Sequence, residues 1–170
     1  GLKTKVGNAV LKPKSKLQVL PSWITAFVVL LQILGIFEVG TLDYGLYPPT
    51  TAFRFTGIII FIVFGILQIQ AFQSLGASYS TEIVILKGHT LRTDKWYRWM
   101  RHPQYLFQLL SDLGAGLALA SWLVLPVVLL VEVPALIIRA KLEEKILLNH
   151  FGAAYEAYRK KSGFMLPFIG

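Results

Sequence analysis

Four long apolar segments limit the folds open to this chain of 170 residues. They cover residues 22–40, 55–72, 104–120 and 122–138. Each is close to the ~20 residues that an α-helix needs to cross the hydrocarbon core of a bilayer. Only Ser121 separates the last two segments, which predicts a tight helical hairpin. We therefore predict an all-α integral membrane protein with about four transmembrane helices.

The composition is typical of a membrane protein. Hydrophobic residues make up 55% of the chain and charged residues 15%, whereas charged residues make up about 25% of soluble domains. The net charge of +8 is compatible with nucleic acid, but the basic residues form no dense stripe and no nucleic-acid motif, so we predict no nucleic-acid partner. There is no cysteine, and the three histidines lack metal-ligand spacing, so we predict no metal site.

Lysine and arginine lie almost entirely on one side of the predicted spans. Of the 17, 16 fall before the first span, between the second and third, or after the fourth, and only Arg54 falls on the other side. Because cytoplasmic loops are enriched in lysine and arginine, both termini are predicted to be cytoplasmic. The basic segment 1–21 has no apolar core ending in a small-residue cleavage site, so we do not expect a signal peptide.

We predict a single membrane domain over residues 1–170, in three parts. Residues 1–21 form a basic cytoplasmic segment, 22–73 the first two spans, and 74–170 a catalytic loop, the helical hairpin and a C-terminal cytoplasmic helix. Within the last part, residues 141–161 carry apolar side chains at helical spacing, which predicts an amphipathic helix interrupted by Gly152.

The stretch "YRWMRHPQY", residues 97–105, concentrates charge directly before an apolar run. Pro103 suits the first turn of a helix, so the third span is predicted to begin there. The free N–H groups and positive dipole end of that helix, beside Arg101 and His102, would bind a carboxylate at the membrane surface. The alternative is that Arg98 and Arg101 only contact lipid phosphates and fix the topology.

Two further stretches carry polar groups beside the spans. Glu143 and Glu144 are adjacent, and Arg139 precedes Glu143 by four residues, which predicts a helical ion pair. The two carboxylates would bind ribose hydroxyls, a cationic group or an arginine, or would simply lie on a solvated helix face. His89, in "LKGHTLRTD", would donate a hydrogen bond to a ligand or belong to a polar surface.

Several residues inside the apolar segments are also unusual. Asp112 and Glu132 are ionisable, and such residues usually face the interior of a membrane bundle and are functional candidates; a structural hydrogen bond is the alternative. Gly114, in "GAG", would let helices approach closely. Pro126 and Pro134 predict a kink in the fourth span.

Taken in order, "GHTL", "YRWMRHPQY", the hairpin and "RAKLEEKILLNHFGAAYEAYRKKSGFMLP" resemble the isoprenylcysteine carboxyl methyltransferase family. That family belongs to a wider group of integral-membrane methyltransferases that includes phospholipid N-methyltransferases. The resemblance covers roughly residues 75–167. It implies a small helical membrane enzyme that binds S-adenosylmethionine in a cytoplasm-facing pocket, closed by the carboxyl-terminal segment, and a lipophilic acceptor that enters from the bilayer.

The resemblance also implies roles for individual residues. The implied cofactor-binding positions are His89, Leu91, Tyr97, Arg101, His102, Pro103, Tyr105 and Glu144. The implied catalytic positions are Arg139, Glu143 and Glu144, and the closing motif is matched by Phe151, Gly152, Tyr155 and Tyr158. His102 and the helix start at Pro103 would hold the methionine carboxylate of the cofactor. Glu143 or Glu144 would accept hydrogen bonds from its ribose or amino group.

The acceptor implied first is a prenylcysteine-type carboxylate, oriented by Arg139, with a phospholipid amine or another hydrophobic molecule as alternatives. An amine would have to lose a proton, to Glu143 or Glu144, whereas a carboxylate needs no general base. Two functions of other classes remain as alternatives. One is a sterol-type NADPH reductase, whose chains are generally longer, and the other is a non-enzymatic membrane scaffold.

Overall fold

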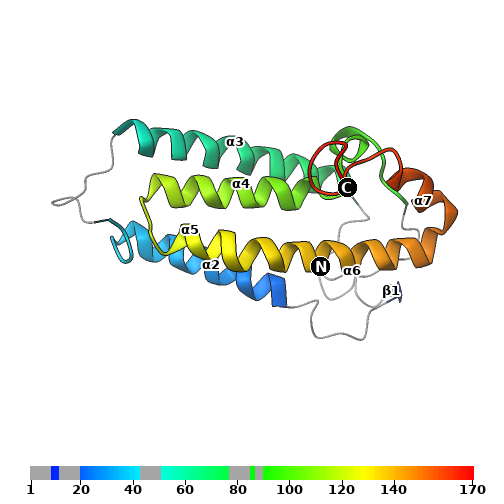
Figure 1. Cartoon of the computed structure of the whole chain (residues 1–170), viewed down its shortest axis with the longest axis horizontal. Helices are drawn as coiled ribbons and strands as arrows, with labels where there is room; N and C mark the ends of the chain where they lie inside the picture. Colours follow the sequence, from blue (N-terminus) through cyan, green and yellow to red (C-terminus); the bar gives the residue numbers. More distant parts are fainter. Residues whose placement is uncertain (1–8, 12–19, 43–50, 77–84, 87–89) are drawn as a thin grey trace.

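The computed structural model describes residues 9–11, 20–42, 51–76, 85–86 and 90–170. The helices form an elongated bundle of two layers (Figure 1). In one layer α3 (Thr51–Leu75) lies beside α4 (Pro103–Ala118), and in the other α2 (Leu20–Ile36) lies beside a long helical run that begins at Val124. The predicted helical bundle is therefore confirmed.

The long run consists of three elements without a break: α5 (Val124–Val127), the π-helix η4 (Val128–Glu132) and α6 (Val133–Phe151). Pro126 and Pro134 lie on either side of the π-helix, so the helix is irregular between the two prolines at which a kink is predicted. Proline removes a backbone N–H from the helical ladder, and widened π turns occur where that ladder is interrupted.

The carboxyl-terminal prediction is wrong in one respect. No separate amphipathic helix begins near residue 141, because α6 continues the fourth span to Phe151. Gly152, with φ of +52°, ends α6, and the short helix α7 (Ala153–Arg159) follows. A positive φ is readily adopted only by glycine, so the predicted interruption at this residue is confirmed.

The all-α prediction also needs a small addition. Strands β1 (Ala9–Leu11) and β2 (Ile85–Leu86) pair antiparallel, with Ala9 opposite Leu86. Strands of two or three residues are too short to show the two-residue alternation by which a sequence indicates a strand.

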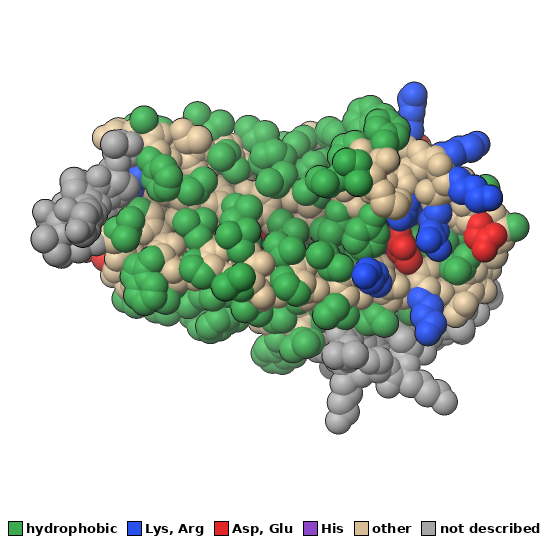
Figure 2. Space-filling view, viewed as in Figure 1, with side chains coloured by type: hydrophobic (Ala, Val, Ile, Leu, Met, Phe, Trp, Pro, Cys, Tyr) green, Lys and Arg blue, Asp and Glu red, His purple; other side chains and the backbone are tan. Residues whose placement is uncertain are grey.

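The lengths of the helices can be compared with the length needed to cross a membrane. Within the described ranges, α3 is the one helix long and apolar enough to cross a membrane by itself, and α2 is a shorter apolar helix of 17 residues. Helix α4 has 16 residues, and the fourth segment is divided among three elements. Apolar side chains cover the body of the molecule in Figure 2, and those of Phe27, Ile59 and Ile62 are exposed.

Helices α3 and α4 approach closely through two glycines. A Cβ on Gly57 would lie 2.3 Å from the backbone nitrogen of Ala118, and one on Gly114 would lie 2.5 Å from that of Phe61. Small residues let the backbones of membrane helices pack this tightly. The predicted role of Gly114 in close helix packing is confirmed.

Helix α2 joins the second layer at both ends of the bundle. At its carboxyl end the Ser121 hydroxyl donates to the Gly40 carbonyl at 3.0 Å, and the turn between α4 and α5 pairs with Thr41. Along its length Val28 and Leu31 belong to a buried apolar cluster with Leu109, Val128 and other residues. This packing holds α2 against the α4–α5 hairpin that carries the site.

Candidate active site

The predicted site residues meet where α4 begins, opposite the middle of α6. The 3-10 turn η3 (Lys95–Arg98) leads into Arg101 and His102, and Pro103 occupies the first turn of α4, as predicted. Across from them α6 carries Arg139, Glu143 and Glu144. Arg139 and Glu143, four positions apart, share one face of the helix, and Glu144 follows directly. All three contact the start of α4, through Tyr105, His102 and Arg101 respectively.

Arg101 is buried and is surrounded by acceptors. Its Nε donates to a carboxylate oxygen of Glu144, and its Nη1 donates to the carbonyl of Ser162 and, at 3.2 Å, to that of Arg159. The guanidinium also lies 5.9 Å from the ring centre of Phe164. A planar guanidinium with five donors suits such a buried position, and here it ties α4 to the chain after α7.

His102 lies between the two glutamates and is 2% exposed. Its Nδ1 is 3.6 Å from Glu143 Oε2, and its Nε2 is 3.5 Å from Glu144 Oε1. The imidazole stacks on Tyr105 and packs edge-on against Phe164. These distances give charge contacts that are longer than ordinary hydrogen bonds.

Arg139 and Glu143 form the other half of the cluster. The Arg139 Nε lies 3.4 Å from Glu143 Oε1, which confirms the predicted ion pair, and donates to the Tyr105 hydroxyl at 2.8 Å. The Tyr105 hydroxyl in turn donates to Glu143. The Arg139 Nη1 donates to the Ser22 hydroxyl on α2 at 3.0 Å. Arg139 therefore joins α2, α4 and α6 at one point.

The neighbouring charges set the protonation of this cluster. Burial by itself would lower the pKa of His102, but the carboxylates of Glu143 and Glu144 outweigh burial and raise it above its ordinary value. Burial would raise the pKa of Glu144, but His102 and Arg101 outweigh it and hold that pKa at about 2. The pKa of Glu143 is likewise lowered by His102 and Arg139 against the effect of burial. An imidazolium between two carboxylates is the expected charge state.

The charges alternate along this cluster, which runs in the order Arg101, Glu144, His102, Glu143 and Arg139. Both nitrogens of His102 are buried without a hydrogen-bond partner among the described residues. Such an arrangement offers donors for a carboxylate and acceptors for an ammonium group or hydroxyls within a few ångströms. It can therefore bind the polar end of a zwitterionic ligand.

The other predicted residues are not members of the charged cluster. The buried Tyr97 donates from its hydroxyl to Gln104 Oε1 at 3.0 Å, and the Tyr158 hydroxyl of the closing motif donates to the Tyr97 carbonyl at 2.6 Å. Leu91 is half-buried. His89 lies outside the described residues. Tyr155 is buried beside Glu144.

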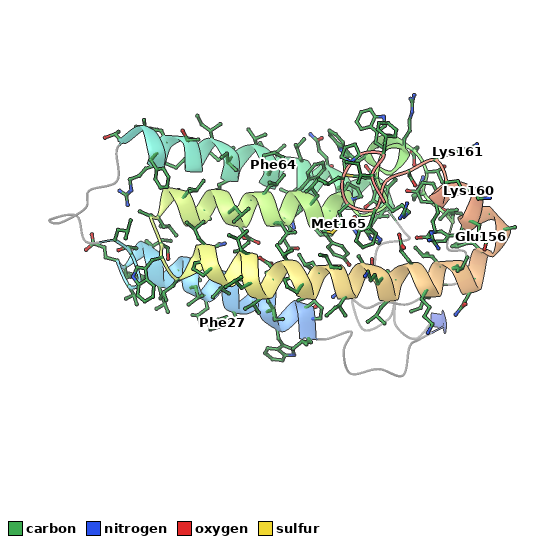
Figure 3. The ribbon with its side chains drawn as sticks, viewed as in Figure 1. Phe27, Phe64, Glu156, Lys160, Lys161 and Met165 are labelled. Atoms are coloured by element: carbon green, nitrogen blue, oxygen red, sulfur yellow. The ribbon has the colours of Figure 1, made fainter. Side chains whose placement is uncertain are left out.

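The carboxyl-terminal chain contributes contacts that sequence reasoning missed. The backbone N–H groups of Arg101 and His102 donate to the carbonyls of Gly163 and Phe164 at 2.8 and 3.1 Å. Figure 3 shows Met165 between α4 and α6, whereas Lys160 and Lys161 lie near the end of the bundle. Backbone acceptors have no signature in a sequence. Ser22 was also missed, because one serine in an apolar run does not indicate its partner.

The residues that precede Arg101 in the sequence line a hollow of about 280 Å³. It is lined by Lys95, Trp96, Arg98 and Trp99 of the η3 region. Trp96 packs edge-on against Trp99 and Phe107. The hollow therefore offers indole rings and two basic side chains just before Arg101 in the chain, whereas Glu143 and Glu144 are partly buried between α4 and α6.

The sequence comparisons agree with this geometry. The sequence model of the isoprenylcysteine carboxyl methyltransferase family matches residues 57–149, more than half of the chain. The chain belongs to this family. The match includes α4 and nearly all of α6, and so contains the six residues Arg101, His102, Tyr105, Arg139, Glu143 and Glu144.

Named relatives are similar over a larger part of the chain. A protein-S-isoprenylcysteine O-methyltransferase of Xenopus laevis is 30% identical over 134 residues, which are 76% of this chain and 46% of the relative. That of Saccharomyces cerevisiae is 31% identical over 115 residues, 66% of this chain and 48% of the relative. The chain thus spans about half the length of these curated relatives.

A solved structure shares the fold. It is described as the eukaryotic intramembrane Ras methyltransferase isoprenylcysteine carboxyl methyltransferase, without a monobody. The TM-score is 0.67 at 22% identity, over 85% of this chain and 52% of that one. At this level of identity the likeness establishes the architecture of the bundle.

Proposed function

We propose that this chain transfers a methyl group from S-adenosylmethionine to a lipophilic acceptor, with a prenylcysteine-type carboxylate as the first candidate. The buried series of alternating charges at the start of α4, in a chain of this family, carries the proposal. Such a series at the end of an apolar bundle suits a reaction between a water-soluble cofactor and a lipid-borne acceptor.

The residues present fit the methionine end of the cofactor, which carries a carboxylate and an ammonium group. Arg101 and His102 would hold the carboxylate, since both side chains carry N–H groups that can donate and both are buried. Glu144 would accept hydrogen bonds from the amino group, and its low pKa keeps it ionised for that role. The bound cofactor supplies an activated methyl group on its sulfonium, so the protein mainly has to position the partners.

Arg139 and Glu143 are proposed to serve the acceptor. Arg139 is 7% exposed and lies where α2, α4 and α6 meet. A guanidinium there would orient an acceptor carboxylate through two parallel hydrogen bonds. Ionised carboxylate needs no base, so Glu143 would position Arg139 rather than remove a proton. The low exposure of these side chains would keep water from the reacting groups.

The proposal includes the arrangement in the membrane. Helices α2, α3 and α4 and the α5–α6 run would cross the bilayer, with both termini and the site on the cytoplasmic side. Figure 2 supports this orientation, because lysine and arginine side chains gather over one end of the molecule. The segment 160–170, which bonds to Arg101 and His102, would close the cofactor pocket.

Calorimetric titration of the detergent-solubilised protein with S-adenosylhomocysteine tests the cofactor, with NADPH as the parallel ligand. We expect saturable binding of S-adenosylhomocysteine, at least tenfold weaker in Glu144→Gln because the ammonium loses a charged acceptor. Lys145→Ala, an exposed neighbour on α6, serves as the control and should bind as the wild type does. Binding of NADPH instead would support a reductase, and binding of neither by folded protein would support a scaffold.

The acceptor is tested by a methyl-transfer assay with a prenylated cysteine and with phosphatidylethanolamine. We expect methylation of the prenylated cysteine, and loss of it when the carboxylate is replaced by a carboxamide. Arg139→Lys should raise the KM for this acceptor while leaving S-adenosylhomocysteine binding intact. Methylation of the phospholipid alone would show that the acceptor is an amine.

A further inference from the structure

We infer that Asp112 and Glu132 form a proton-binding site inside the bundle, in which one proton is shared between the two carboxyl groups. The site lies in the seam between the two helical layers, on α4 and at the end of η4. It belongs to no step of the proposed methyl transfer. The ligand of this site is a proton.

One oxygen of Glu132 is fully satisfied. Glu132 Oε1 accepts from the Gln108 amide at 2.7 Å and from the Thr25 hydroxyl at 3.3 Å. Gln108 also donates to Thr25 at 2.9 Å, so α2, α4 and η4 are joined by a closed triangle of hydrogen bonds. The side chain of Glu132 is 0% exposed. Bulk water therefore does not reach this carboxyl group in the described fold.

The inference depends on the other carboxyl oxygen of Glu132, Oε2. Glu132 Oε2 is buried and has no hydrogen-bond partner within the part of the chain that the structure describes. Asp112 follows Gln108 by one turn on the same face of α4, and Gln108 donates to Glu132, which places the two carboxyl groups side by side, where they interact electrostatically. Two ionised carboxylates cannot bond to each other, because both only accept. A proton on either group creates the missing donor and turns the contact into a hydrogen bond.

Asp112 has a donor of its own on α2. The Gln32 amide donates to Asp112 Oδ1 at 2.7 Å, and Asp112 is 8% exposed. Together with Gln108 and Thr25, the pair thus has three neutral donors. These donors can stabilise the one negative charge that remains after the proton is shared.

Among the described helices that surround the pair, no opposite charge replaces the proton. Helices α2 and α5 carry no charged residue, and Asp112 is the only one on α4. The nearest cation on α6 is Arg139, seven residues from Glu132, which is paired with Glu143 and bonded to Tyr105 and Ser22. The cation of α3, Arg54, precedes Gly57, which contacts the far end of α4 at Ala118.

The energetics favour one shared proton. An unpaired charged side chain in the hydrocarbon region of a membrane is energetically costly. Two carboxylates in contact repel each other as well, which is why like-charged pairs elsewhere retain a proton. A hydrogen bond between a protonated acid and a carboxylate removes one of the two charges, and at the same time it gives Glu132 Oε2 a hydrogen-bond partner.

Infrared spectroscopy of the full chain in lipid nanodiscs tests the site. A protonated carboxylic acid has a C=O stretch separated from the carboxylate and amide bands, and it shifts in D₂O. We expect such a band at neutral pH in the wild type. It should be lost in Glu132→Gln and in Asp112→Asn, because each new amide donates to the remaining carboxylate. Asp94→Asn, at an exposed position, should keep the band.

Selective ¹³C labelling of glutamate or aspartate carboxyl groups in the wild type gives a second readout that needs no variant. The band should shift with one or both labels. Absence of a protonated-acid band at neutral pH, or a band unchanged in both variants, would overturn the inference. Because the readout involves no cofactor or acceptor, failure of the proposed methyl transfer would leave this result unaffected.

Discussion

The cluster at the start of α4 and the seam between the layers use the same residue types in opposite ways. In the cluster, Glu143 and Glu144 face Arg101, His102 and Arg139, so buried negative charge is balanced by buried positive charge. In the seam, Asp112 and Glu132 face each other, and the hydrogen-bond donors to them among the described residues are the neutral side chains of Thr25, Gln32 and Gln108.

The difference shows how each region stabilises its carboxyl groups in apolar surroundings. Balanced ion pairs keep carboxylates ionised, at the end of the bundle where we propose that the cofactor binds. Neutral donors without a counter-charge favour a protonated acid, deeper in the bundle. Removal of one residue should therefore harm the cluster more than the seam, since a lost partner leaves a buried charge unpaired in the cluster alone.

The largest expected effect is that of Arg101→Ala. Truncation would leave Glu144 with one cation fewer and the Ser162 carbonyl without its donor, and breaking a buried pair costs about 3–5 kcal/mol. Denaturant titration of the purified protein would measure the loss in unfolding free energy. Arg98→Ala, exposed on η3, should change it by less than about 0.5 kcal/mol. Equal effects of the two variants would contradict the comparison.

A smaller effect is expected from pH, because protonation leaves each side chain in place. Glu144 has a lowered pKa of about 2, against an ordinary value of 4.5, so its contribution is present above pH 4.5 and is lost as the pH falls towards 2. His102 has a raised pKa, so its contribution is complete below its ordinary value of 6.5 and is lost as the pH rises through the raised value.

The midpoint of thermal unfolding should therefore be highest between these limits and fall on both sides. Glu144→Gln should flatten the acid limb, and His102→Gln the alkaline limb, since each removes one titrating group. An alkaline limb that persists in His102→Gln would mean that another group titrates there.

A still smaller effect is expected from Glu132→Gln in the seam. The amide keeps the shape of a protonated acid and can donate to Asp112, so the loss should be about 1 kcal/mol or less. Glu144→Gln, the same change in the cluster, should cost several times more by the same denaturant titration. A cost for Glu132→Gln as large as that for Glu144→Gln would show that the seam holds an ionised pair.

The smallest expected effect comes from Ser22→Ala, which sharpens the comparison at the point where the regions adjoin. It removes the 3.0 Å hydrogen bond to Arg139 and should cost about 0.5 kcal/mol, at the low end for one hydrogen bond. Arg139 keeps Tyr105 and Glu143 as partners. In the methyl-transfer assay we expect a modest rise in the acceptor KM. Ser22→Thr, which keeps the hydroxyl, should behave as the wild type does.

Local patterns in the sequence determined the helices and most of the cluster. Apolar runs of near-spanning length predict the bundle, because a helix satisfies its own backbone groups. Pro103 predicts the start of α4, because proline fits a first helical turn. The four-residue spacing of Arg139 and Glu143 predicts their ion pair, because that spacing returns to one helix face.

Only the tertiary structure decided which distant groups meet. The distances from Arg101 to Ser162, from Arg139 to Ser22 and from Glu132 to Thr25 depend on how the layers pack, and no spacing along the chain encodes them. The same holds for protonation. Asp112 and Glu143 look alike in a sequence, but burial beside neutral amides or beside cations gives them different charge states, because the surroundings set the cost of a buried charge.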